Sequence, residues 1–160
     1  MNKMNFLELD KNKILDYQQN RDPYLMIDHA NKVIPGKSAE GYKLLKKNEW
    51  FFKVHWPGDP NMPGMLQTEA LIQMSALIIQ TMPGNKGKTL YLVDSNNLKF
   101  FKKILPGDKL NIFSKLISSN RGLFKFDAEG FVENQKACKA SFTLVIPGSI
   151  KPINMDIKEI

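Results

Sequence analysis

Residues 62–84 have the sequence MPGMLQTEALIQMSALIIQTMPG, in which a long apolar run lies between two Pro-Gly pairs. Pro and Gly commonly bound a helix, so this spacing predicts one long helix from about Gly64 to Thr81. The apolar side chains cover most directions around the helix axis: Ala70, Leu71, Ile72, Met74, Ala76, Leu77, Ile78 and Ile79. A helix that is apolar nearly all round is normally buried. We therefore expect this helix to form the centre of the fold.

The segments around the helix are expected to be mostly strands. Residues 138–146 alternate between an apolar set that begins at Cys138 and a second, mostly more polar set, a period of two that predicts one buried face. Cys138 is then a small buried hydrophobe. Further strands are predicted at 24–34, 38–46, 89–101, 109–118 and 123–132, and a short helix at 11–20. The predicted class is α+β, with a single antiparallel sheet curled round the central helix and the last four strands forming a meander.

Composition excludes several classes of protein. The chain has 160 residues, 42% of them hydrophobic and 24% charged, which fits one globular domain rather than a disordered or fibrous chain. A single cysteine excludes an internal disulfide and a cysteine-based zinc site, and two histidines exclude a histidine-rich metal cluster. There is no apolar window of membrane-spanning length and no signal-peptide pattern, so we expect a cytoplasmic protein that does not insert into a membrane.

The charge balance is basic, with a formal net charge of +7. Residues 86–103 carry five lysines against Asp94 alone, which indicates either a solvated face or a surface for an acidic partner. No nucleic-acid recognition motif accompanies the lysines, so nucleic acid is not an expected partner.

Three polar residues form a stripe on the predicted central helix. Glu69 and Gln73 are four residues apart, and Gln80 lies three turns beyond Glu69, so all three face one direction. Burial raises the pKa of a carboxyl group toward neutrality, which suits a general acid. Gln73 could orient Glu69 through a hydrogen bond between side chains four residues apart. The alternative is a structural glutamate whose carboxylate is satisfied by backbone or by a partner.

A stiff loop with three prolines and two glycines runs from His55 to the start of this helix. A lone histidine in a loop is more often structural than catalytic. With Glu69 nearby, however, a neutral imidazole and a neutral carboxylic acid could act as base and acid. The N–H of Gly64 lies at the helix N-terminus, where unpaired N–H groups and the helix dipole could stabilise an oxyanion.

The composite motif HWPGDPNMPGMLQTEALIQ, residues 55–73, resembles the signature of the β-hydroxyacyl-acyl carrier protein dehydratases of bacterial fatty-acid synthesis. Residues 23–28, Phe51-Phe52 and the segment 99–108 fit the same family, so the resemblance covers about residues 20–146. It implies the hot-dog fold. We expect a single domain over residues 1–160, with its core at about 20–146, the helix at about 11–20 before it and an extension at 147–160. It also implies elimination of water from a 3-hydroxyacyl thioester to give a trans-2-enoyl thioester.

The resemblance assigns roles to individual residues. His55 and Glu69, separated by 69 − 55 = 14 positions, match the catalytic histidine and carboxylate. Gly64 matches the donor to the thioester carbonyl, Gln73 the glutamine that supports the acid, and Tyr91 an aromatic residue that gates the acyl tunnel. Three lysines fall where the family has basic residues facing the carrier protein: Lys99, Lys102 and Lys103.

The resemblance also implies partners and cofactors. The partner is an acyl carrier protein, whose substrate carries its own phosphopantetheine, and no metal or redox cofactor is expected. Each active site takes its histidine from one subunit and its carboxylate from the other. A homodimer is then the minimum unit, and a trimer of dimers is common.

The chain departs from the family pattern at Val54, Trp56, Asp59 and Lys103, and also over residues 20–25, where NRDPYL replaces the family's usual run. These departures leave open a specialised acyl or polyketide pathway in place of housekeeping fatty-acid synthesis. Two other functions also stay open: a hot-dog thioesterase, and a non-catalytic module that binds acyl thioesters or a carrier protein. The sequence gives neither the acyl chain length nor the choice between acyl carrier protein and coenzyme A.

Overall fold

The computed structural model describes residues 6–148. These residues form seven strands and three helices. In chain order the elements are β1 (Leu7–Leu9), α1 (Lys11–Tyr17), β2 (His29–Ile34), β3 (Ser38–Leu44), α2 (Trp50–Val54), α3 (Gly64–Gln80), β4 (Tyr91–Phe100), β5 (Lys109–Asn120), β6 (Leu123–Val132) and β7 (Gln135–Val145).

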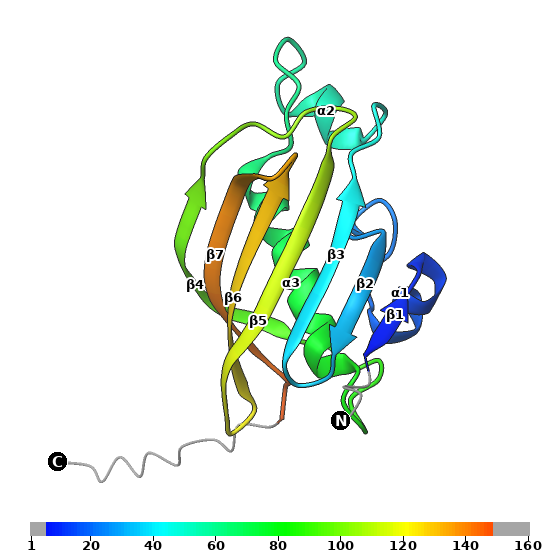
Figure 1. Cartoon of the computed structure of the whole chain (residues 1–160), viewed down its shortest axis with the longest axis vertical. Coiled ribbons are helices and arrows are strands. Elements are labelled where there is room, and N and C mark those ends of the chain that lie inside the picture. Colours follow the sequence, from blue (N-terminus) through cyan, green and yellow to red (C-terminus); the bar gives the residue numbers. More distant parts are fainter. Residues whose placement is uncertain (1–5, 149–160) are drawn as a thin grey trace, which may run out of the picture.

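The seven strands form one antiparallel sheet in the order β1-β2-β3-β5-β6-β7-β4. The sheet curls around α3, which lies against its concave face (Figure 1). Ala70, Leu71, Met74, Leu77 and Ile78 of α3 are fully buried, so the helix is the centre of the core. The predicted hot-dog architecture, a curled sheet around one long helix, is confirmed.

Inward-facing residues of the strands complete the core around the helix. Cys138 is buried as predicted, and burial raises the pKa of its thiol to about 12. A buried polar contact between α3 and the sheet joins the hydroxyls of Ser75 and Ser114, 2.5 Å apart. This hydrogen bond connects the middle of α3 to β5.

The predicted four-stranded meander is wrong. Only β5, β6 and β7 follow one another in space, because β4 crosses to the far edge of the sheet and pairs with β7. The segment between β4 and β5 spans the end of the sheet near α2 (Figure 1). Period-two patterns show that a segment is a strand, but they do not identify its neighbours.

Several element boundaries also differ from expectation. The predicted strand 24–34 begins only at His29, since residues 24–28 instead lie beside α3 and bond to Gln73. The short helix ends at Tyr17 rather than at residue 20. Strand β1 and helix α2 were not predicted, because three and five residues are too few to show a period. Most of the expected C-terminal extension, residues 149–160, lies outside the described residues.

Candidate active site

Glu69 is positioned by Gln73, one turn further along α3. The amide Nε2 of Gln73 donates to Glu69 Oε1 at 2.8 Å and to the backbone carbonyl of Tyr24 at 2.9 Å. Its Oε1 accepts from the backbone N–H of Met26 at 2.7 Å. The amide is therefore held at three points and cannot rotate without losing bonds. This confirms the predicted bond between positions 69 and 73 and fixes one carboxylate oxygen.

The environment of Glu69 favours its protonated form. Burial raises the pKa of this carboxyl above its ordinary value of 4.5, and the Gln73 hydrogen bond only partly opposes the rise. The pKa of the Tyr24 phenol is raised too, chiefly by burial and then by the negative charge of Glu69. A rise in the pKa of a carboxyl group is the direction that suits a general acid.

His55 follows directly on α2, whose C-terminus it caps. Its backbone N–H donates to the Phe51 carbonyl at 2.9 Å, and its ring stacks on Trp56 with centroids 4.4 Å apart. Within residues 6–148, Nδ1 of His55 is buried and has no hydrogen-bond partner. The backbone bond places His55 at the end of α2, and the contact that orients its ring is the stacking on Trp56.

The structure places these residues in two separate clefts of the chain. His55 and Gly64 line a cleft of about 570 Å³ together with Trp56, Lys102 and Lys103. Glu69, Gln73 and Tyr91 line a second cleft of about 300 Å³. The two residues expected to act together as base and acid therefore do not share a cleft within one chain.

Gly64 lies at the first position of α3, where its N–H has no partner within the helix. The ring of Phe100 packs against it so closely that a Cβ here would come within 2.9 Å of Phe100 Cζ. A larger residue at this position would therefore require the half-exposed ring of Phe100 to shift. The His55 cleft is thus bounded by a bare backbone amide and an aromatic ring.

The three candidate carrier-binding lysines have different surroundings. Lys99 is exposed on β4. Lys102 donates to Gln135 Oε1 at 3.1 Å, and Lys103 forms an ion pair with Asp59 of the proline-rich loop. Lys102 and Lys103 lie at the rim of the His55 cleft, and Lys99 lines neither cleft.

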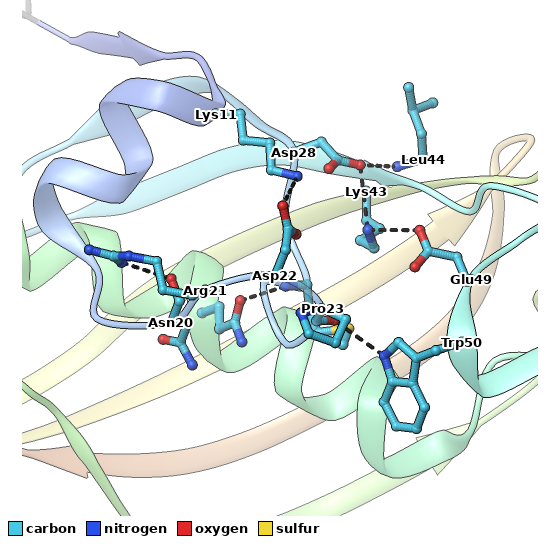
Figure 2. A network of polar contacts seen from close by, with 12 residues as sticks. Lys11, Asn20, Arg21, Asp22, Pro23, Asp28, Lys43, Leu44, Glu49 and Trp50 are labelled. Atoms are coloured by element: carbon cyan, nitrogen blue, oxygen red, sulfur yellow. Dashed lines mark hydrogen bonds and ion pairs between the residues drawn. The ribbon is translucent and has the colours of Figure 1, made fainter.

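The sequence did not lead us to predict a largely buried ion cluster that Lys43 of β3 forms with Asp28 and with Glu49, the residue before α2 (Figure 2). Lys43 Nζ lies 3.0 Å from Glu49 Oε1 and 3.7 Å from Asp28 Oδ2. Asp28 Oδ2 also accepts from the Leu44 backbone N–H at 2.8 Å. Next to the cluster, Trp50 Nε1 donates to the Pro23 carbonyl at 3.2 Å. These bonds hold the start of α2, and hence the helix that ends beside His55, against β3 and the 22–28 segment.

One signal in the sequence could have revealed this cluster. Ala39, Gly41 and Lys43 alternate with outward residues along β3, and all three are buried. A lysine in the inward register of a strand needs a buried partner.

Within residues 6–148 no group of three or more His, Cys, Asp or Glu side chains is arranged to hold a metal ion. In the same part of the chain, no helix combines the length and the apolar character that crossing a bilayer requires.

Comparison with known proteins places this arrangement in a family. The sequence profile of the FabA-like domain matches residues 19–141, which contain both clefts. The chain belongs to the FabA-like domain family. This confirms the resemblance drawn from the motif at residues 55–73.

Curated relatives of similar length agree. The chain is 36% identical to a 3-hydroxyacyl-[acyl-carrier-protein] dehydratase FabZ of Alkaliphilus metalliredigens over 88% of this chain and 95% of that protein. It is also 36% identical to a protein of the same name from Lactobacillus helveticus, over 91% of this chain and 98% of the relative.

Solved structures support the fold. One chain of the dehydratase heterocomplex ApeI:P from Xenorhabdus doucetiae superposes with a TM-score of 0.71 at 12% identity, covering 84% of this chain and 90% of that one. A hypothetical thioesterase from Streptococcus pneumoniae, solved with coenzyme A, gives 0.58 at 17% identity, covering 73% and 83%. At these identities the likeness concerns the fold alone.

Proposed function

We propose that the chain is a 3-hydroxyacyl-[acyl-carrier-protein] dehydratase, which removes water from a 3-hydroxyacyl thioester and leaves a trans-2-enoyl thioester. The observation that carries the proposal is the Glu69 carboxyl, which Gln73 holds in place on α3 and whose pKa is raised by burial. FabZ relatives matched over nearly their whole length support the same reaction.

In the proposed mechanism His55 removes a proton from C2 of the substrate. The N–H of Gly64 donates to the thioester oxygen, where negative charge develops as the C2 proton leaves. Glu69 gives its proton to the C3 hydroxyl, which departs as water, and the electron pair from C2 forms the new double bond. The reaction needs neither an oxidant nor a reductant, so no redox cofactor is part of the proposal.

The two clefts support a shared active site in a homodimer. A chain whose His55 and Glu69 open into different clefts needs a second copy to complete each site. Strand β4 ends the sheet as an unpaired edge, and its side chains Tyr91, Leu92 and Val93 are 59%, 48% and 54% exposed. Exposed apolar strand edges are normally covered. A dimer formed over β4 would cover this edge, and a trimer of dimers stays a prediction.

The phosphopantetheine-linked substrate would enter through the cleft that holds His55. Lys102 and Lys103 lie at that cleft, and Lys99 projects from the neighbouring strand β4. An acidic acyl carrier protein would meet complementary charge there. The Asp59 ion pair lowers the net charge that Lys103 offers, so Lys99 and Lys102 are the stronger candidates.

A hydration assay in the reverse direction tests the proposed function. Purified protein is mixed with trans-2-enoyl thioesters on acyl carrier protein and on coenzyme A, and loss of the conjugated enoyl absorbance is followed. His55→Ala and Glu69→Gln should each lower kcat by about 100- to 10,000-fold, the usual contribution of a general acid or base. His29→Ala, which changes the chain's other histidine on β2, serves as the matched control.

Other outcomes would reject the dehydratase. Release of free thiol would indicate a thioesterase. Binding of thioesters without turnover by the wild-type protein would indicate a non-catalytic module. Loss of activity in His29→Ala to the same extent as in His55→Ala would show that His55 has no special role.

A further inference from the structure

The imidazole of His55 is oriented by a neighbour that moves with it. Its ring stacks on Trp56, the next residue of the chain, so this contact does not fix either ring relative to the sheet. A group that removes a proton must be placed accurately, because an error of about 1 Å can lower the rate on the order of 100-fold. The position of the imidazole therefore depends on the placement of α2, which ends just before His55.

Helix α2 is too short to determine its own direction. It has five residues, and His55 follows Glu49 by 55 − 49 = 6 positions, about 9 Å along a helix axis. Phe51 and Phe52 are buried beneath it, but burial of apolar surface is non-directional. Directional polar contacts must therefore set the tilt and the rotation of α2.

The closest of these contacts from a side chain lies at the start of the helix. Glu49 precedes α2, and its carboxylate makes no capping bond to the helix but lies 3.0 Å from Lys43 Nζ. Because the two side chains are only 5% and 12% exposed, solvent screens this charge-assisted bond weakly. The neutral bond from Trp50 Nε1 to the Pro23 carbonyl is longer, at 3.2 Å (Figure 2).

Lys43 is itself fixed to the sheet. It occupies an inward position of β3, and its Nζ lies 3.7 Å from Asp28 Oδ2. The same oxygen of Asp28 accepts from the Leu44 backbone N–H at 2.8 Å. If Lys43 were removed, Asp28 would keep its bond to Leu44, whereas Glu49 would lose the cation that binds it. The loss of Lys43 should therefore be felt mainly at α2.

We propose that Lys43 is a positioning residue for the base of the reaction: it holds Glu49, and through α2 it sets the place of the His55 imidazole. The inference rests on the proposed dehydratase function, which gives His55 the role of base. Lys43 lines neither cleft and so acts through α2 rather than on the substrate. Its removal should lower kcat and leave KM nearly unchanged.

The test separates placement of His55 from stability. In the hydration assay, Lys43→Met should lower kcat per folded molecule at least about 10-fold. The triple variant Asp28→Asn, Lys43→Met, Glu49→Gln leaves no unpaired charge and should regain stability, but without the ion pair its kcat should stay low. Val33→Ala, a truncation of a fully buried residue at the other end of the β2–β3 hairpin, should lose stability and keep its kcat.

Tryptophan fluorescence gives a second readout that needs no activity. The chain has two tryptophans, Trp50 at the start of α2 and Trp56 directly after His55, so the signal reports on both ends of this helix. Quenching by acrylamide should increase in Lys43→Met and in the triple variant, because α2 is held less firmly. It should stay at the wild-type level in Val33→Ala.

Three results would overturn the inference. They are a triple variant that regains wild-type kcat together with its stability, a Lys43→Met protein with wild-type kcat, and a Val33→Ala protein that loses as much kcat as Lys43→Met. Wild-type protein that hydrates no enoyl thioester would instead reject the dehydratase. Fluorescence then decides whether Lys43 places α2, and quenching of Lys43→Met at the wild-type level would show that it does not.

Discussion

At Glu69, burial makes the folded chain hold a proton more tightly than the unfolded chain does. The folded pKa lies above the ordinary value of 4.5, so the folded state binds more protons in the interval between the two values. The free energy of unfolding therefore falls as pH rises through that interval. In acid, Glu69 is protonated in both states and does not lower the free energy of unfolding. At high pH it is ionised in both states, and its burial then lowers the free energy of unfolding most.

Glu69→Gln should remove this penalty while it removes activity. The glutamine keeps an oxygen that can accept from Gln73, so the supporting bond survives. Urea unfolding should give similar stability for variant and wild type below about pH 4, and greater stability for the variant at about pH 8. A variant that is less stable than wild type at pH 8 would show that the ionised carboxylate is favourably paired.

At the scale of the element, α2 depends on tertiary contacts, since a helix of five residues does not form by itself. Phe51 and Phe52 are buried, and Glu49 before the helix is bound by Lys43. The side chains of Lys43, Glu49 and Asp28 are only 5%, 12% and 15% exposed. The cluster therefore sets how α2, and the His55 that follows it, lies on the sheet.

Lys43→Met should destabilise the protein by about 2–4 kcal/mol, because it leaves two largely buried carboxylates without their cation. The triple variant Asp28→Asn, Lys43→Met, Glu49→Gln should recover much of that loss. Lys103→Met breaks the exposed pair with Asp59, whose partners are 56% and 52% exposed, and should cost less than about 1 kcal/mol. Urea denaturation measures all three. Equal losses for Lys43→Met and Lys103→Met would contradict the buried cluster.

The elements also show what the sequence could predict. Helix α3 was predictable because a long, mostly apolar run lies between two Pro-Gly pairs, and β7 because Cys138, Ala140, Phe142 and Leu144 keep a strict period. The position of β4 in the sheet could not be predicted. Its pairing with β7 depends on the path of the connection between strands, which the hydrophobic pattern of a strand does not record. Within the candidate site, the 69–73 hydrogen bond followed from helical spacing. The ion pairs of Lys43 join three segments that are distant in the sequence. The only indication of them in the sequence is that Lys43 occupies an inward-facing position of its strand.

At the scale of the whole molecule, the unpaired β4 edge and the divided site favour the same assembly. Tyr91 and Leu92 belong both to the exposed edge and to the cleft that holds Glu69. A second copy over this edge would bury apolar surface and close the cleft in one step. It would also bring a partner's His55 cleft toward Glu69, which does not share a cleft with the His55 of its own chain.

Mixing two inactive variants tests this assembly directly. Equal amounts of His55→Ala and Glu69→Gln are unfolded together, refolded and assayed for hydration of an enoyl thioester. If each site combines two chains, random pairing makes half of the dimers mixed, and each mixed dimer holds one intact site, so about a quarter of wild-type activity returns. His55→Ala refolded with the double variant His55→Ala, Glu69→Gln contains no intact pair and should stay inactive. If the first mixture also stays inactive while refolded wild type recovers, both groups act within one chain, and the two clefts must then come together by a movement of α2 rather than by dimerisation.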